Sequence, residues 1–224
     1  MLNADEVRFL AILVQKGHLP KAAAERVLAA AAGGGHLPDL LGQLGLMDAG
    51  RYAYLIGTGG EDVPPVPGYE YQGQAGFGGT SVVFKGVKRA TGELAALKIM
   101  HRELHQDPVQ KRRFVQEAKM LIDLDFPAVI KGYRVGHVKT EEGEERLVFI
   151  MEWAEGRTLL ELLRDGKQFE EDLALYIILQ TAQALQYLHG KGILHRDVKP
   201  DNIILSNDNQ VKLIDLGFAG HLDK

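Results

Sequence analysis

Two short polar stretches near the C-terminal end of the sequence contain the side chains with the clearest chemical potential. The first reads HRDVKPDN at 195–202, and the second reads DLG at 215–217. A carboxylate can accept a proton from an attacking hydroxyl, an ammonium can neutralise a phosphate, and carboxylate and amide oxygens can hold Mg²⁺. Transfer of a phosphoryl group from ATP to a hydroxyl requires this combination.

Each role falls on a particular residue. Asp197 could accept the hydroxyl proton, and Lys199 could neutralise charge on the transferred phosphate. Asn202 and Asp215 could hold Mg²⁺ together through their side-chain oxygens. Asp215 comes directly after a predicted strand at 211–214. A polar loop capped by aspartate and asparagine is the plainer interpretation. Five matched polar positions within eight residues favour the chemical one.

Two further features upstream could serve the same chemistry. The stretch GFGGTSVV at 76–83 lies between two predicted strands, and its glycines would let backbone amides approach a phosphate. Lys98 ends the apolar run Ala96-Leu97-Lys98 and would need a partner if buried, which Glu117 on the next helix could supply. Alone, each has a plainer interpretation, namely an ordinary turn and a pair of surface charges.

The spacing of apolar residues predicts the strands and helices that must position these side chains. Apolar residues predict paired strands at 81–87 and 94–100 around a Thr91-Gly92 turn. Helices are predicted at 110–124 and 172–189, and a buried strand at 147–153. A strand-rich part followed by helices indicates an α+β domain with two lobes.

The first 56 residues repeat themselves. Placing Gly17 over Gly45, an offset of 28 residues, aligns two units that each read as helix, glycine stop, helix. We therefore expect an all-α bundle of two helical hairpins over 1–56, followed by a Gly- and Pro-rich, semi-extended spacer over 57–68. The repeat loosely resembles N-terminal modules of type II secretion ATPases, some of which bind cyclic dinucleotides. A docking or regulatory bundle without its own ligand is the favoured interpretation.

Composition excludes several other classes of protein. A formal net charge of −4 gives no electrostatic support for binding nucleic acid. The sequence has no cysteine, which excludes disulfides, thiolate catalysis and cysteine metal sites. No apolar run is long enough for a membrane helix, and the N-terminus lacks the pattern of a signal peptide, so a cytoplasmic protein is expected.

Taken in order, the motifs resemble those of the Hanks-type protein kinases, in particular the bacterial serine/threonine branch. The resemblance runs from about residue 69 to the C-terminus and implies an N-lobe at 69–153 and part of a C-lobe at 154–224. It covers the glycine loop, Lys98, Glu117, the hinge 151–154, the catalytic loop HRDVKPDN, and DLG in place of the family's D-F-G.

The resemblance implies a role for each matching residue, with ATP and Mg²⁺ as cofactors. Asp197 is implied as the base, with Lys199, Lys98 and Glu117 as further catalytic residues, and Asn202 and Asp215 as magnesium ligands. The glycine loop would cover the phosphates, and an apolar slot closed by the gatekeeper Met151 would hold adenine. The implied nucleotide contacts are Ala75, Gly76, Phe77, Gly78, Ser81, Val83, Ala96, Lys98, Met151, Glu152, Ala154, Asn202, Ile204 and Asp215.

Three departures from the family pattern leave every catalytic group in place. Ser81 replaces the third loop glycine and is expected to stiffen the loop. Leu216 replaces phenylalanine and still offers an apolar plug. Phe126 and Ala128 replace the histidine and asparagine of the H-P-N segment, which is expected to loosen a buried hydrogen bond.

The family continues beyond D-F-G with an activation segment, an A-P-E anchor and peptide-binding helices, so we expect this chain to be the front portion of a longer kinase. The helix at 173–188 is apolar nearly all round, which predicts exposed apolar surface here. Arg196 would pair with a phosphorylated activation loop.

Three functions stay open at this point. The first is a protein kinase acting on Ser/Thr hydroxyls, as Lys199 indicates. The second is a non-catalytic scaffold that still binds ATP, with 1–56 docking a partner or regulatory ligand. The third is a small-molecule phosphotransferase of the same fold, which Arg196 and Lys199 disfavour.

Overall fold

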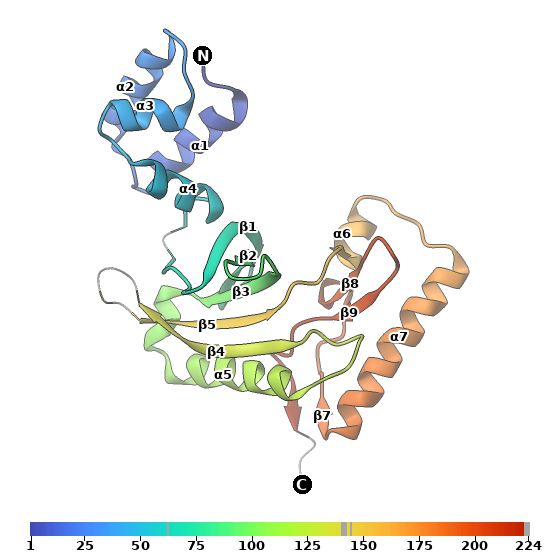
Figure 1. The fold of residues 1–224 in the computed structure, drawn as a ribbon. Helices are drawn as coiled ribbons and strands as arrows, with labels where there is room; N and C mark the ends of the chain where they lie inside the picture. Colours follow the sequence, from blue (N-terminus) through green and yellow to red (C-terminus); the bar gives the residue numbers. More distant parts are fainter. Residues whose placement is uncertain (62, 140–142, 144, 222–224) are drawn as a thin grey trace.

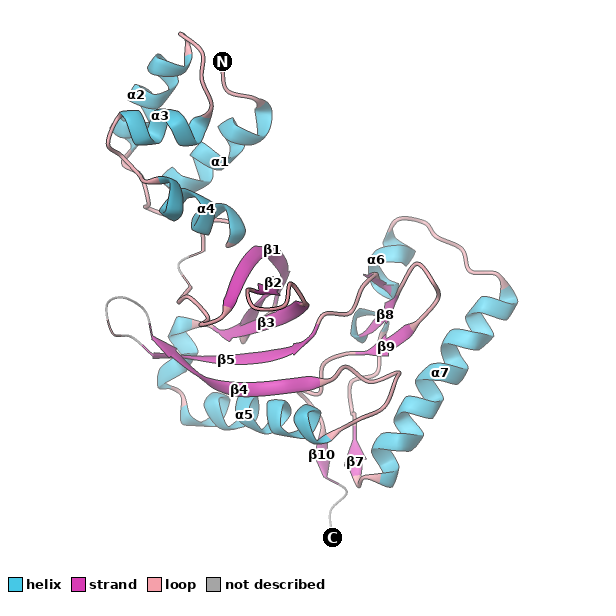
Figure 2. Cartoon of the chain, viewed as in Figure 1, coloured by secondary structure: helices cyan, strands magenta, loops and turns pink. Residues whose placement is uncertain are grey.

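The computed structural model describes residues 1–61, 63–139, 143 and 145–221 (Figure 1). A helical part comes first, a strand-rich part follows, and helices then alternate with short strands (Figure 2). This order confirms the predicted α+β fold with a preceding all-α bundle. Residues 222–224, which end the predicted range 69–224, lie outside the described residues.

The N-terminal helices follow the predicted repeat. Gly17 and Gly45 adopt φ angles of 79° and 63°, the left-handed conformation that glycine tolerates, and so end the first helix of each hairpin. Asn3 caps the first helix in a capping box with Glu6, and Asp48 caps the last. The helices are α1 (Ala4–Gln15), α2 (Lys21–Ala31), α3 (Leu37–Gln43) and α4 (Ala49–Gly57).

One apolar cluster holds these helices together. Its members recur at three- and four-residue steps, so each helix turns one stripe toward the others. Its centre is made of fully buried aliphatic side chains: Leu13, Val27, Leu37, Leu41 and Leu55.

The described residues of the connection, 58–61 and 63–68, form no helix or strand, and some of them pack against the sheet. Val63 and Val66 are 6% and 3% exposed and join the apolar cluster on the outer face of the sheet. The Tyr71 hydroxyl donates a hydrogen bond to the Pro64 carbonyl at 2.7 Å. The prolines and glycines explain the irregular backbone, whereas the two valines explain why it packs.

Gly57→Ala is expected to lower the free energy of unfolding by about 1–3 kcal/mol, as overpacking does. A Cβ at Gly57 would stand 2.5 Å from the Tyr71 carbonyl oxygen, so α4 and the sheet would have to move apart. Gly42→Ala is the matched control, because a Cβ there meets nothing within 4 Å. The control should be neutral or stabilising by about 0.5–1 kcal/mol. Urea unfolding measures both, and equal effects would contradict close packing at Gly57.

A five-stranded antiparallel sheet follows, in the order β1-β2-β3-β5-β4. The predicted strands at 81–87 and 94–100 are confirmed, and Gly92 in the turn between them has a φ of 74°. Their register places Val83 opposite Lys98. The strands are β1 (Tyr69–Phe77), β2 (Ser81–Lys88), β3 (Leu94–Met100), β4 (Gly132–Lys139) and β5 (Glu145–Glu152).

The two faces of the sheet are covered by different elements. Side chains alternate along β3, so Met100 packs in the cluster under helix α5 (Pro108–Asp123), whereas Leu97 and Ile99 pack in the outer cluster beneath 57–68. A short 3₁₀ helix, η1 (Arg102–Gln106), leads from β3 into α5. Lys98 therefore points to the α5 side, as Glu117 requires.

The C-terminal part is joined to the segment between α5 and β4 through strand β9 (Val211–Leu213). Leu213 donates to the Ala128 carbonyl at 2.8 Å and accepts from the Ile130 amide at 3.0 Å. This fixes the chain just before Asp215. Short strands pair as β6-β8-β9 and as β10-β7. The elements are β6 (Arg157–Thr158), α6 (Leu159–Arg164), α7 (Glu171–Gly190), β7 (Ile193–Leu194), η2 (Pro200–Asn202), β8 (Ile203–Leu205), β9 (Val211–Leu213) and β10 (Gly220–His221).

Helix α7 confirms the predicted exposure of apolar surface. Ile177, Ala184 and Leu188 are buried on one side. The exposed side carries Leu175 at 56%, Ile178 at 65% and Leu179 at 54%. Across the described ranges, neither α7 nor any other helix is long and apolar enough to cross a membrane.

Candidate active site

A cavity of about 610 Å³ lies between the sheet and the C-terminal part. Strands β1, β2 and β3 form one wall, the segment after β5 forms the back, and β8 and the segment after β9 form the floor. Glu117 is in its wall, together with every residue predicted to contact a nucleotide: Ala75, Gly76, Phe77, Gly78, Ser81, Val83, Ala96, Lys98, Met151, Glu152, Ala154, Asn202, Ile204 and Asp215.

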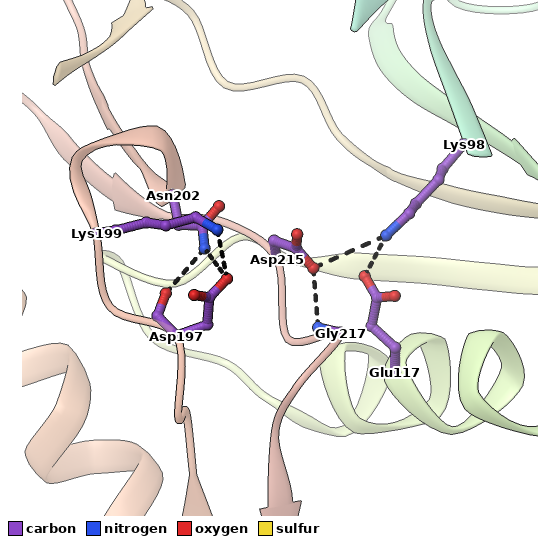
Figure 3. Close-up of polar contacts among 7 residues, drawn as sticks. All are labelled: Lys98, Glu117, Asp197, Lys199, Asn202, Asp215 and Gly217. Atoms are coloured by element: carbon purple, nitrogen blue, oxygen red, sulfur yellow. Dashed lines mark hydrogen bonds and ion pairs between the residues drawn. The ribbon is translucent and has the colours of Figure 1, made fainter. Parts of the chain in front are cut away.

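A buried ion pair crosses the cavity (Figure 3). The Lys98 ammonium lies 2.6 Å from a Glu117 carboxylate oxygen, and these side chains are 11% and 7% exposed. Burial raises the pKa of Glu117, and the adjacent Lys98 ammonium opposes that rise. Asp215 reaches the same cluster, with an oxygen 3.9 Å from the Lys98 nitrogen. A cation is thus held where anionic phosphates could reach it.

The backbone around Asp215 is shaped to present its carboxylate. Asp215 has a φ of 68°, a left-handed conformation that a non-glycine residue seldom adopts. Its Oδ1 accepts a hydrogen bond from the Gly217 amide at 2.8 Å, and the neighbouring Ile214 amide donates to the Asn202 carbonyl at 2.8 Å. Strain of this kind at a cavity wall is typical of functional sites.

Asp197, Lys199 and Asn202 form a second polar cluster beside the first (Figure 3). One Asp197 carboxylate oxygen lies 2.8 Å from the Lys199 ammonium and accepts from the Asn202 amide at 3.0 Å. The hydrogen bond from Lys199, followed by that from Asn202, lowers the pKa of Asp197. The carboxylate therefore stays ionised and able to accept a proton.

The donors present fit a hard cation. The Asn202 amide nitrogen donates to both the carbonyl and the carboxylate of Asp197, so the Asn202 side-chain oxygen is the atom left to bind a metal. Asp215 adds a carboxylate. No group of three or more His, Cys, Asp or Glu side chains that could hold a metal occurs within the described ranges. One or two protein oxygens together with substrate phosphates are the usual environment of Mg²⁺.

His195 and Arg196, the first two residues of the stretch 195–202, contact the Asp197 backbone and Gly220, respectively. His195 is 2% exposed, and its Nδ1 accepts a hydrogen bond from the Asp197 amide at 3.3 Å. Burial lowers the pKa of His195. Arg196 has a φ of 64°, and its guanidinium lies against Gly220, where an added Cβ would stand 2.7 Å from an arginine nitrogen. The segment after DLG thus already contacts Arg196.

The side chain of Glu152 makes an interaction that sequence reasoning missed. It pairs with the Lys212 ammonium at 2.7 Å and accepts from the Lys131 amide at 3.1 Å. A signal was available, because Lys212 is the lone charge between two apolar residues of β9 and must point to the opposite face. The pair ties the segment behind the cavity to the strand that leads to Asp215.

Other residues also line the cavity. Gly79, Thr80, Trp153 and Gly217 belong to the glycine loop, the hinge and DLG, which the sequence had already singled out. The others come from α5, α6 and the segments beside the motifs; they were missed because no local pattern separates them from ordinary helix or loop residues. The indole N–H of Trp153 is buried there without a hydrogen-bond partner among the described residues. The missed residues are Gln110, Arg113, Phe114, Ile130, Gly156, Thr158, Glu161, Ile214 and Phe218.

Two residues that depart from the family pattern, Ser81 and Leu216, are both buried, at 4% and 2% exposure, and Ser81 lines the cavity.

At the H-P-N position the Phe126 ring stacks on Tyr187 of α7, with centroids 4.8 Å apart. The Asp125 amide donates to the Tyr187 hydroxyl at 2.9 Å. Aromatic packing and a backbone hydrogen bond therefore anchor this loop.

Comparison with known proteins agrees with this geometry. The protein kinase domain family matches residues 69–224. A probable serine/threonine-protein kinase of Streptomyces coelicolor is 34% identical over 151 residues, covering 67% of this chain and 22% of that protein. Serine/threonine-protein kinase PknB of Mycolicibacterium smegmatis is 35% identical over 151 residues, covering 67% and 24%.

A third relative, serine/threonine-protein kinase pkn2 of Myxococcus xanthus, is 33% identical over 147 residues, covering 64% of this chain and 17% of that protein. The chain thus spans no more than 24% of the length of these relatives. The family match covers the whole strand-rich part and the catalytic loop. On this match, the chain belongs to the protein kinase family.

Proposed function

We propose that the protein transfers the γ-phosphate of ATP to Ser or Thr hydroxyls of proteins in a Mg²⁺-dependent reaction. The observation that carries this proposal is the convergence of the Lys98–Glu117 ion pair, Asp215 and Asn202 at one cavity, with Asp197 hydrogen-bonded to Asn202 just outside its lining. The names of the relatives, which are serine/threonine-protein kinases, support the substrate class.

Adenine would occupy the apolar part of the cavity. Val83, Ala96 and Ile204 supply aliphatic walls, and Met151 closes the back opposite Ala96 in the β3–β5 pairing. Glu152 and Ala154 also line the cavity, and their backbone groups would form hydrogen bonds with the edge of the base. Such a site combines apolar area with a few directed hydrogen bonds.

The phosphates would lie between the glycine loop and Lys98. Backbone amides of the glycine loop other than that of Gly78, which donates to the Ser81 carbonyl, would point at them, and Lys98, held by Glu117, would bind the α- and β-phosphates. Mg²⁺ bound by Asn202 and Asp215 would neutralise phosphate charge. Burial of the Lys98–Glu117 pair strengthens its electrostatic effect, because little water screens it.

In the reaction, the substrate hydroxyl oxygen bonds to the γ-phosphorus while the bond from that phosphorus to the β–γ bridging oxygen breaks, and ADP leaves. The hydroxyl proton passes to Asp197, whose ionised carboxylate also orients the hydroxyl. Lys199 stands 2.8 Å from that carboxylate and would neutralise charge on the phosphoryl group in flight.

We also propose a division of labour along the chain. Residues 1–56 would form a docking or regulatory bundle, 57–68 the connection, 69–153 the N-lobe and 154–224 part of the C-lobe. The repeat and its own apolar cluster support a separate role for the bundle.

Addition of ATP with Mg²⁺ is expected to raise the melting temperature of the chain. Saturation at 100 times the dissociation constant stabilises the native state by about 2.7 kcal/mol. Asp215→Asn should remove most of the Mg²⁺-dependent part, because the amide keeps the shape but loses the charge. Thermal shift with and without EDTA measures this, and phosphate transfer to a generic basic protein tests the reaction. Binding without transfer by a longer chain would favour the scaffold, and no binding would refute the proposal.

A further inference from the structure

The tip of the glycine loop has few contacts of its own. Phe77 is 70% exposed, a Cβ at Gly79 would meet nothing within 4 Å, and Thr80 is exposed. The hairpin is closed by one backbone hydrogen bond, from the Gly78 amide to the Ser81 carbonyl at 2.9 Å. Glycines give this tip many alternative conformations, so holding it in one requires contacts from elsewhere.

His101, immediately after β3, supplies three such contacts. Its backbone amide donates to the Thr80 carbonyl at 3.0 Å. Its Nε2 lies 2.7 Å from the Gly78 carbonyl oxygen, and its ring centroid lies 4.8 Å from that of Phe77. A carbonyl oxygen only accepts, so Nε2 must carry the hydrogen in this arrangement. One side chain therefore holds two successive residues of the tip.

We propose that His101 is a positioning residue that pins the glycine loop over the phosphates of ATP. This inference rests on the proposed function. His101 stands three residues beyond Lys98 at the end of the strand, so the same strand would orient the lysine that binds the phosphates and the loop that covers them. Fixing the loop before ATP arrives reduces the conformational entropy lost on binding.

The position of Phe77 links this contact to the helical bundle. Phe77 lines the nucleotide cavity, and together with His101 it also lines a smaller cavity of about 220 Å³. Lys16 and His18, from the turn between α1 and α2, are in the wall of the smaller cavity. The contact between His101 and Phe77 thus lies at a cavity that residues of the bundle also line.

Three substitutions separate the parts of the contact, and all keep the backbone hydrogen bond to Thr80. His101→Gln keeps an N–H donor but loses the ring, His101→Phe keeps the ring but loses the donor, and His101→Ala loses both. His137→Ala, at an exposed histidine on β4, is the matched control. The dissociation constants of ATP with Mg²⁺ and of adenosine, measured by calorimetry on the full chain, are the readouts.

His101→Ala should weaken ATP binding roughly 3- to 10-fold, the range of one lost hydrogen bond. Adenosine binding should change less than about twofold, because adenosine has no phosphates for the loop to hold. His101→Gln should restore ATP affinity better than His101→Phe if the hydrogen bond dominates, and the reverse order would assign the effect to the ring.

Either order supports a positioning role, and the control should match the wild type. Unchanged ATP affinity in all three variants would overturn the inference, as would equal weakening of ATP and adenosine, because a merely structural role predicts the latter. Both outcomes presuppose that the wild type binds ATP. Failure of the wild type to bind would instead refute the proposed function itself.

Discussion

Asp197→Asn is expected to slow phosphoryl transfer roughly 10²–10⁴-fold while ATP binding stays close to that of the wild type. The amide keeps the size of the side chain but cannot take up the hydroxyl proton. Its hydrogen bonds to Lys199 and Asn202 would also change, because an amide presents one acceptor and one donor where the carboxylate presents two acceptors. Rates of γ-phosphate transfer by a longer chain, under single-turnover conditions, measure the effect.

Asp201→Asn, in the same loop and exposed to solvent, is the matched control and should change the rate less than about twofold. The pH profile gives a second check. Asp197 has its pKa held below the ordinary 3.8 by Lys199 and Asn202, so the rate should not fall through its protonation between about pH 5 and 8. A variant that transfers phosphate normally would exclude Asp197 as the base.

Lys98→Met is expected to lower the free energy of unfolding by about 3–5 kcal/mol and to weaken ATP binding. The substitution keeps an unbranched side chain of nearly the same length but leaves the Glu117 carboxylate buried without its cation. The Lys98 ammonium lowers the pKa of Glu117 and so counteracts the effect of burial; without it, the pKa of Glu117 should rise further. Denaturant unfolding of the variant and the wild type measures the change.

The pH dependence of that loss has a defined sign. A carboxyl whose pKa is higher in the folded state favours the folded state below its unfolded pKa of 4.5, and this contribution disappears as the pH rises through the folded pKa. Lys98→Met should therefore lose more stability at pH 8 than at pH 5, relative to the wild type.

The double variant Lys98→Met/Glu117→Leu separates stability from function. Replacing both charges by apolar side chains removes the uncompensated carboxylate, so stability should recover to near that of the wild type, with no steeper pH dependence. ATP binding should stay weak, because the phosphates have lost their cation. Single and double variants of equal stability would contradict a coupled buried pair.

The features that the sequence predicted correctly share one property, namely that a local pattern dictates them. Gly17 and Gly45 end helices because only a left-handed residue permits the turn, and each unit of the repeat shows it. The strands at 81–87 and 94–100 are fixed in register by their turn and by the alternation of their side chains. The sequence predicted the Lys98–Glu117 ion pair because a lysine in an apolar strand needs a counter-charge.

The features that sequence reasoning missed depend on contacts between distant segments. Strands of two or three residues such as β7, β8 and β10 are too short to show a period. The stacking of Phe126 on Tyr187 and the pairing of Glu152 with Lys212 join residues 61 and 60 positions apart. The packing of 57–68 was also missed, because proline and glycine describe how the backbone bends and not what it touches.

That packing has a mechanical consequence. Val63 and Val66 lie inside the outer cluster and Gly57 lies against the Tyr71 carbonyl, so these described residues fasten the end of α4 and its connection to the sheet. Helix α4 contacts β1, whose far end is Phe77 in the glycine loop, so a displacement of α4 is expected to shift β1 as well. A partner that binds the helical repeats would therefore be coupled, through α4 and β1, to the glycine loop that lines the cavity.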